Sequence, residues 1–343
     1  MPTFSNKRVA NTLLILVAIV CFSYAQNVSA LSISPVRVEV SGNPGETIEK
    51  ETTLINDSDA SEVIYYSSYA NFEASGDTGN PSFVEGNHDI ATWMFVPASI
   101  SLKPKESKKI NLKIEIPKDA EPGGHFGAVF WGTSPNNPGS GVSIGAKTGV
   151  LVLLSVNGDV KEGGGLVDFV LKDKKVFYNT LPVSLVYRFR NDGGDRIKPV
   201  GKITMHDLFY IPEDKINANP TSGNILPNST RRFEVDWVKN PRAKDYVEPN
   251  GPIGKFFDKA LYQWKNYAFG PYFAKLDLLY GTNATRVSKT VFFFVFPWQL
   301  LICLAVILFI VFWGGRKLLR RYNRYIIQKA RLGIKTPNDA GHE

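Results

Sequence analysis

Cysteine is almost absent from this sequence. Its 343 residues contain two, Cys21 and Cys303, and each lies in one of the two strongly apolar segments near the ends of the chain. The 260 residues from Leu31 to Thr290 contain none, which excludes a disulfide framework and a thiolate metal site in this part. Without cross-links this part has to be stabilised by apolar cores, and it is long enough for two domains of ordinary size.

Histidine and catalytic motifs are also scarce. Three histidines fall between the apolar ends, His88, His125 and His206, and none has another ligand at metal-binding spacing. No His-Glu-x-x-His, Cys-x-x-Cys or Gly-x-Ser-x-Gly motif occurs. The acidic loops at 56–59 and 76–78 lack the ordered ligand series of a calcium loop. The sequence therefore predicts a protein that is not an enzyme and that has no metal site and no cofactor.

The basic excess of the chain is confined to its ends. Of the formal net charge of +8, Lys7 and Arg8 supply two, and the residues from Gly314 onward supply six, with eight basic residues against two acidic ones. Residues 31–313 are therefore neutral. Electrostatic binding of nucleic acid requires positive charge on the exposed domains, so we exclude DNA and RNA as partners.

The N-terminal segment has the pattern of a secretory signal peptide. Lys7 and Arg8 precede the apolar run 13–20, and Val28-Ser29-Ala30 provides the small residues of a cleavage site. We expect residues 1–30 to be removed between Ala30 and Leu31.

The C-terminal segment predicts a single membrane span. Residues 291–313 are 23 residues without a charge, enough at about 1.5 Å per residue to cross a hydrocarbon core of roughly 30 Å. Trp298 and Trp313 are placed like aromatic belt residues, and Arg316 and Lys317 begin a basic cytoplasmic tail, residues 314–343. This predicts a single-pass type I protein of the plasma membrane with an extracytoplasmic ectodomain.

Between these ends the pattern is that of an all-β protein. Residues 31–40, 47–56, 63–69, 108–116, 126–131 and 150–156 read as strands, as do 167–171, 183–189, 202–205, 232–237 and 273–279. Both groups contain a proline turn, an alternating strand with basic flanks, and a glycine–aromatic turn that opens another strand. We therefore expect two tandem Ig-like β-sandwiches, over 31–160 and 161–290.

One segment, residues 253–268, has helical periodicity instead. Phe257, Leu261, Trp264 and Ala268 fall on one face of the predicted helix, and its charged residues lie largely elsewhere. One interpretation is a helix that lies on the outer membrane leaflet, and the other is a helix that covers one end of the second sandwich. We favour the second, because an apolar stripe more often faces a core than a membrane interface.

Specific motifs in the first predicted sandwich suggest a family. Leu31-Ser-Ile-Ser-Pro-Val-Arg-Val38, the strand 47–56 and Pro122-Gly-Gly-His-Phe-Gly-Ala-Val129 resemble the WxL-interacting surface proteins of Gram-positive bacteria. The resemblance implies a peptidoglycan-binding-type sandwich, a second partner-binding sandwich, one transmembrane helix and a short basic tail. More remotely, the first part is similar to pilus-chaperone sandwiches. Gly123, Gly124, His125 and Phe126 are then candidate turn or binding-loop residues, although the same glycines suit a simple scaffold turn.

These observations lead to a hypothesis about function. We expect a membrane-anchored surface protein whose sandwiches bind cell-wall glycan, such as peptidoglycan, or another surface protein. The alternatives are a membrane-tethered chaperone that works by strand addition and an accessory subunit of an export or envelope complex.

Overall fold

The computed structural model describes residues 31–59, 61–134, 147–240 and 251–333. The predicted signal peptide lies outside these residues. The chain forms two compact units. The first comprises the chain up to Gly165 together with 189–198 and 224–231, and the second comprises 166–188, 199–223 and the residues from Arg232 onward.

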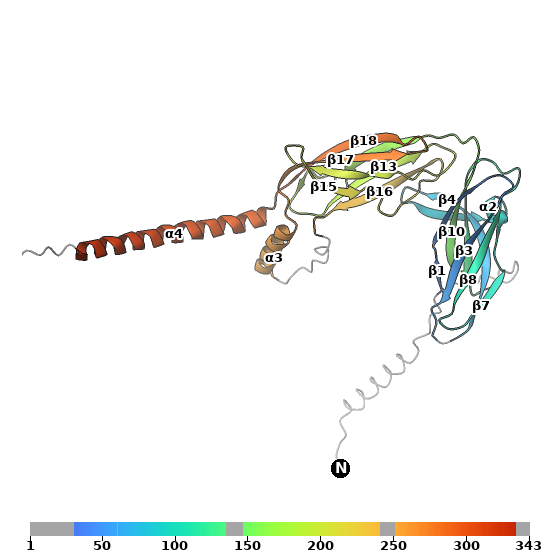
Figure 1. Ribbon diagram of the computed structural model, residues 1–343, viewed down its shortest axis with the longest axis horizontal. Helices are drawn as coiled ribbons and strands as arrows, with labels where there is room; N and C mark the ends of the chain where they lie inside the picture. The colour runs from blue at the N-terminus through green and yellow to red at the C-terminus, as the bar shows by residue number, and fades with distance from the viewer. Residues whose placement is uncertain (1–30, 60, 135–146, 241–250, 334–343) are drawn as a thin grey trace, which may run out of the picture. The chain divides into compact units, whose positions relative to one another are not determined.

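The first unit contains two β-sheets (Figure 1). One sheet has the order β1-β3-β8-β6, and the other has the order β2-β10-β9-β4-β5, with β7 also paired to β4. The elements are β1 (Leu31–Ser34), β2 (Arg37–Gly42), β3 (Thr47–Asn56), β4 (Val63–Ser75), β5 (Asn80–Glu85), α2 (Ile90–Trp93), β6 (Met94–Phe95), β7 (Ser99–Leu102), β8 (Ser107–Glu115), β9 (Gly123–Gly132) and β10 (Lys147–Val156).

The second pair of sheets repeats this topology. Its sheets have the orders β11-β13-β16 and β12-β18-β17-β14-β15. The elements are β11 (Gly164–Leu171), β12 (Phe177–Tyr178), β13 (Val183–Asn191), β14 (Val200–His206), β15 (Pro212–Asn217), β16 (Ser229–Trp237), β17 (Gly270–Tyr280) and β18 (Thr285–Val295). Strand for strand, β11-β13-β16 corresponds to β1-β3-β8, and β12-β18-β17-β14-β15 corresponds to β2-β10-β9-β4-β5. In both, the second strand pairs in parallel with the last. The expected all-β fold of tandem sandwiches is confirmed.

Alternation along the strands produces the core of the first unit. In β8, Ile110, Leu112 and Ile114 are buried and the residues between them are largely exposed. Opposite them, Val150, Val152 and Leu154 of β10 belong to the same buried cluster. Side chains of successive strand residues point to opposite faces, so each sheet presents one apolar face to the other.

The first predicted strand, 31–40, is two strands. Leu31–Ser34 pairs antiparallel with β3, and Arg37–Gly42 pairs in parallel with β10 in the other sheet. Pro35 stands at the break, where its missing N–H cannot weaken a ladder. Apolar and polar residues alternate on both sides of Pro35, so the sequence pattern did not reveal that one strand ends there and another begins.

A buried asparagine ends the third strand of each sheet pair. Asn56 donates from Nδ2 to the carbonyls of Ser61 (3.2 Å), Leu102 (3.1 Å) and Lys103 (3.1 Å), and its Oδ1 accepts from the N–H of Ser58. Its counterpart on β13 is Asn191.

Asn191 repeats these contacts. It donates to the carbonyls of Asp195 (2.7 Å) and Ile225 (2.9 Å), and its Oδ1 accepts from the N–H of Gly193. Both side chains are fully buried. Each amide therefore satisfies loop carbonyls that would otherwise be buried without a donor.

Among the described residues, two helices belong to the second unit, α3 (Pro252–Lys265) and α4 (Trp298–Gly333). The predicted membrane span 291–313 differs from the structure, because Val291–Val295 form the end of β18 and the helix begins at Trp298. The end of β18 and the start of α4 are both apolar and without charge, so their composition predicted one continuous segment. Helix α4 is long and apolar enough to cross a membrane.

Replacing the buried asparagine of the first unit should destabilise it. Asn56→Ala leaves buried carbonyls without their donor, which costs about 1–3 kcal/mol. Asn111→Ala is the matched control, because Asn111 is exposed in β8 and donates only to the exposed Glu49, and it should change stability by less than about 0.5 kcal/mol. Urea unfolding of the full chain measures both, followed by the fluorescence of a background in which Trp131, buried in the first unit, is the only tryptophan kept. Equal stability of the two variants would contradict the role of Asn56.

Candidate functional site

The outer face of the five-strand path of the first unit is unusually apolar. Residues of β4, β9 and β10 that point away from the core form a second buried cluster of Phe72, Phe126 and Leu153, against which Leu151 and Leu226 pack. The ring of Phe72 lies 6.2 Å from that of Phe83 and 5.9 Å from that of Phe126. The solvent face of an antiparallel sheet is ordinarily polar, so apolar residues there indicate a contact surface.

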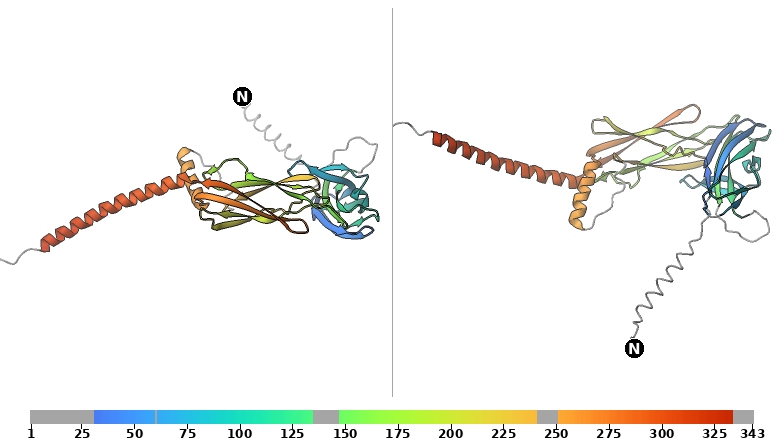
Figure 2. Two further views of the ribbon diagram at one scale, coloured as in Figure 1. Left: turned by 90° about the horizontal axis from the view of Figure 1, so that it is seen from above. Right: turned by 60° about the horizontal axis from the view of Figure 1, so that its bottom comes forward.

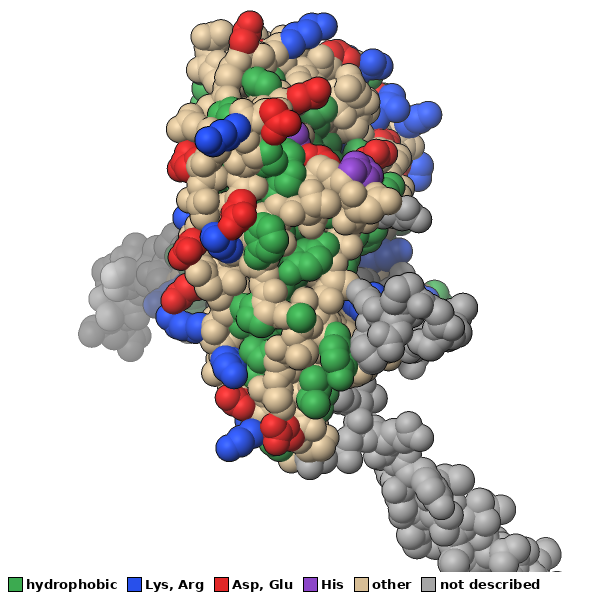
Figure 3. Space-filling model, turned by 90° about the vertical axis from the view of Figure 1, so that its right-hand side faces the viewer, with side chains coloured by type: hydrophobic (Ala, Val, Ile, Leu, Met, Phe, Trp, Pro, Cys, Tyr) green, Lys and Arg blue, Asp and Glu red, His purple; other side chains and the backbone are tan. Residues whose placement is uncertain are grey.

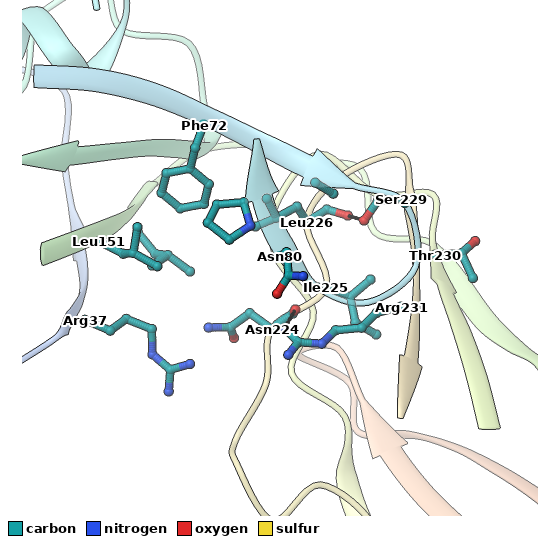
Figure 4. Close-up of a pocket in the computed structure, with 15 residues that line it drawn as sticks. Arg37, Phe72, Asn80, Leu151, Asn224, Ile225, Leu226, Ser229, Thr230 and Arg231 are labelled. Atoms are coloured by element: carbon teal, nitrogen blue, oxygen red, sulfur yellow. Dashed lines mark hydrogen bonds between the residues drawn. The ribbon is translucent and has the colours of Figure 1, made fainter. Parts of the chain in front are cut away.

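A recess opens beside this cluster (Figure 4). Its volume is about 150 Å³, and every residue that lines it belongs to the first unit. The apolar side of the recess is formed by Phe72, Leu151, Leu153 and Leu226. The remaining lining residues are Arg37, Ala74, Gly76, Gly79, Asn80, Pro81, Asn224, Ile225, Ser229, Thr230 and Arg231.

A carboxylate organises the polar side of the recess. Glu39, next but one to Arg37 on β2, accepts from Arg37 Nε at 2.9 Å, Lys198 Nζ at 2.6 Å and Asn224 Nδ2 at 2.9 Å. Burial raises the pKa of Glu39, but the hydrogen bonds from Lys198 and Asn224 and the two positive charges outweigh it, so that pKa lies below its usual value. These contacts fix Arg37 and Asn224 at the rim.

Asn224 has a buried acceptor without a donor beside the recess. Its side chain is buried, its Nδ2 is bound to Glu39, and its Oδ1 accepts no hydrogen bond from any described residue. The backbone carbonyl of Asn224 accepts from Arg231 Nη1 at 2.7 Å, which ties the loop 224–231 together. The buried side-chain oxygen Oδ1 lacks a donor among the described residues, which costs free energy in the folded chain.

The predicted residues 123–126 lie at the start of β9 and not in a turn. Gly123 has a φ of +129°, and a Cβ on it would meet the carbonyl oxygen of Gly194 at 2.7 Å. A Cβ on Gly124 would meet the ring of Phe126 at 2.4 Å. Both glycines therefore allow close packing within the unit, and of the four residues Phe126 is the one that joins the apolar cluster.

His125, predicted as a turn or binding-loop residue, is partly buried and hydrogen-bonded. Its Nδ1 lies 2.5 Å from Asp89 Oδ1, its Nε2 lies 2.9 Å from the carbonyl oxygen of Glu121, and its ring centroid is 4.7 Å from that of Trp93. Burial lowers the pKa of His125, but the contacts with Asp89 and Glu121 outweigh it and raise that pKa above its usual value.

The structure also places the predicted membrane-interface residues. Trp298 is the first residue of α4, and Trp313 lies in its exposed apolar stretch. Lys317 Nζ lies 5.2 Å from the ring centroid of Trp313. Arg316 is the residue directly before Lys317 on the helix. The interface role of all four stays a prediction.

No group of three or more His, Cys, Asp or Glu side chains that could hold a metal occurs among the described residues. On the face of the first unit that Figure 3 shows, hydrophobic side chains are exposed among Lys, Arg, Asp and Glu of both signs. The arrangement of the recess suits binding of an apolar group.

Sequence reasoning missed the residues that form the recess. Phe72 lies just beyond the predicted strand 63–69. Asn224 precedes the proline turn that we predict in the second sandwich, and Leu226 is the first residue of that turn. Asn224 meets Glu39 across 185 residues of sequence. The one available signal was the outward register of Leu151 and Leu153, which alternate with the core residues of β10.

No protein-family model matches the sequence, and neither does any curated protein. Solved structures with a similar fold include the class 5 fimbriae chaperone CfaA, with a TM-score of 0.35 and 13% identity over 77% of this chain and 99% of that chain. The E. coli chaperone DraB has a TM-score of 0.31 and 12% identity, over 77% of this chain and 97% of that chain. A chaperone–tip adhesion subunit complex of Acinetobacter baumannii, CsuC–CsuE, has a TM-score of 0.30 and 13% identity, over 60% and 90%. Likeness at this level does not transfer a function.

The first unit should lose stability as the pH rises through the folded-state pKa of His125. Because this pKa is raised, the stabilisation is complete below the unfolded value of about 6.5 and disappears above the folded value. Urea midpoints, followed by fluorescence in the background that keeps only Trp131, should therefore fall between pH 5.5 and pH 8 with His125 present, and fall less in His125→Gln. An equal fall in both proteins would show that the pair with Asp89 does not stabilise the fold.

Proposed function

We propose that this chain is a membrane-anchored, non-catalytic protein whose first unit binds another exported protein. The observation that supports this most is the recess on the outer face of the β2-β10-β9-β4-β5 sheet, with its apolar floor of Phe72, Leu153 and Leu226. A partner would place one apolar side chain in the recess.

The size of the recess favours a side chain over a larger ligand. Pockets for small molecules usually have volumes of about 300–1,000 Å³. An apolar cavity of about 150 Å³ accommodates a group the size of benzene. The recess has about this volume, and its floor is aliphatic and aromatic. A Phe or Leu side chain of a polypeptide therefore fits it better than a glycan, which would bring hydroxyl groups onto the apolar floor.

Helix α4 supplies the proposed anchor. From Trp298 to Gly315 it has 18 residues without a charge, a length of about 27 Å, close to the thickness of a hydrocarbon core. Arg316, Lys317, Arg320 and Arg321 follow on the same helix. By the positive-inside rule this end is cytoplasmic, which puts both units outside the cytoplasm.

Strand addition is a second candidate function. Strand β11 pairs with β13 on one side and with no described strand on the other. Its exposed residues include Val167 and Val170, without the lysines that commonly protect an edge. A strand of a partner could pair there, as expected of a tethered chaperone or of an accessory subunit of an envelope complex.

The resemblance in the first sandwich offers a more specific version of the proposal. For a chain related to the WxL-interacting proteins, the partner would be a surface protein of a Gram-positive cell. Wall glycan is then the competing ligand, and retention on protease-treated cell walls distinguishes the surface protein from the glycan.

Filling the recess should abolish partner binding. Ala74 lines the recess on β4, and Ala74→Trp would occupy the space that a partner side chain needs. Ser68→Trp is the matched control, because Ser68 points to the same face of the same strand and lies outside the recess. We expect Ala74→Trp to weaken retention of a discrete exported protein at least tenfold, about 1.4 kcal/mol, and Ser68→Trp to leave it unchanged.

The assay uses the full chain in lipid nanodiscs, incubated in parallel with exported proteins and with isolated, protease-treated cell walls. Saturable retention on the treated walls by the natural chain and by Ala74→Trp alike would refute the proposal in favour of glycan binding. If Ala74→Trp retains the exported protein and a charged substitution on β11, Val167→Lys, loses it, strand addition replaces the recess as the binding mode.

A further inference from the structure

Helix α3 exposes three of the four residues of the predicted apolar stripe, Phe257, Leu261 and Trp264, whereas the fourth, Ala268, lies beyond the helix and is buried. Ile253, Phe257, Leu261 and Trp264 are 74%, 60%, 51% and 61% exposed. At about 100° per residue they fall within an arc of about 80° on the helix surface. The residues through which α3 contacts the rest of the unit, Ala260 and Gln263, lie on the neighbouring arc and are buried. The helix does not cover the end of the sandwich with this stripe.

Gln263 fixes α3 to the start of the proposed membrane span. Its Nε2 donates to Gln299 Oε1 at 2.5 Å and to the carbonyl of Asn179 at 3.1 Å, and its Oε1 accepts from the N–H of Leu300 at 2.9 Å. The rings of Phe256 and Trp298 are 5.9 Å apart. In the three ribbon views α3 lies across the start of α4 and does not run along it (Figures 1 and 2).

A second segment exposes apolar residues at the same end of the sheet. Leu208, Phe209, Tyr210 and Ile211, which connect β14 to β15, are all at least half exposed, and Phe209 is 78% exposed. His206 pairs with Phe273 near the beginning of β17, where Gly270 pairs with Val295, three residues before α4. The register therefore brings this connection to the end of the unit from which α4 departs.

The connection 208–211 is held in its exposed conformation. Asp207 Oδ1 accepts from the N–H groups of Phe209 (3.0 Å) and Ile211 (2.8 Å). The ring of Tyr210 stacks on His206 with centroids 4.3 Å apart. These contacts keep the apolar side chains from folding back onto the sheet, so their exposure is built into the structure.

We propose that α3 and the connection 208–211 form a collar that inserts into the outer leaflet of the lipid bilayer around the start of α4. The proposal rests on the anchoring role of α4. If α4 enters the hydrocarbon at Trp298, then the groups bonded to Gln299 and Leu300 lie at the level of the lipid headgroups. Aromatic and aliphatic side chains are stable there, and an in-plane helix with one apolar stripe is the usual form of an interfacial helix.

The charges of α3 agree with a lipid surface. Lys255, Lys259 and Lys265, against the single Asp258, lie away from the exposed stripe. Lysines at the edge of such a helix can extend toward phosphate headgroups while their methylene stems stay near the acyl chains. The collar would fix the second unit against the membrane, so that it could not swing freely on α4.

Spin-label accessibility tests the collar in the full chain. Single cysteines, in a background with Cys21→Ser and Cys303→Ser, are labelled at Leu261→Cys on the stripe, at Phe209→Cys, and at Lys259→Cys on the polar side of α3. Leu308→Cys, on the exposed apolar surface of α4, reports anchoring itself. Nanodiscs of phosphatidylcholine and phosphatidylglycerol that hold one chain each exclude a second copy as the occupant.

We expect labels at positions 308, 261 and 209 to be several-fold more accessible to oxygen than to a water-soluble nickel complex, and the label at 259 to show the reverse. With position 308 in lipid, an aqueous label at 261 or 209, or one shielded from both probes as in a protein contact, overturns the collar and leaves the anchor intact. An aqueous label at 308 overturns the anchor and the collar together.

Discussion

The burial of two asparagine side chains, Asn56 and Asn191, is the constraint on which both sheet pairs depend. No described part of the chain carries a disulfide, so nothing covalent joins the two sheets of either pair. Each asparagine ends the third strand and satisfies the carbonyls of the turn that leads to the strand beside it, Leu102 in one case and Ile225 in the other. The contact of Asn191 with Ile225 fixes where the neighbouring residues Asn224 and Leu226 lie, and therefore the shape of the recess.

The same architecture produces two surfaces with different chemistry. On the first unit, the outward residues Phe72, Leu153 and Phe126 form an apolar floor, and Glu39 positions the polar rim. On the second unit, the exposed stripe of α3 lies beside the start of α4, held there by Gln263. The first surface is a recess of about 150 Å³, and the second is a stripe of exposed apolar side chains on one helix. Binding and anchoring are thus assigned to separate units.

Much of the fold followed from local pattern. The strand 47–56 was predicted with the bounds that β3 has, and the helix 253–268 differs from α3 by a few residues at its ends. The pattern failed where two structures share one composition, as at Val291–Val295, which is strand and not membrane helix. It also favoured a core contact for a stripe of which Phe257, Leu261 and Trp264 are exposed, because periodicity shows which residues share a face and not what covers that face. The recess could not be predicted, since Asn224 and Glu39 are distant in sequence.

The claim that the first unit binds an exported polypeptide in its recess is tested most directly by photo-crosslinking in living cells. A photoreactive amino acid at Thr230, which lines the recess, is compared with the same amino acid at Ser68, which lies on β4 outside the recess. The account predicts one discrete polypeptide crosslinked from position 230, absent from position 68, and lost when Ala74→Trp is added. Adducts with wall glycan alone, or the same products from both positions, would contradict it.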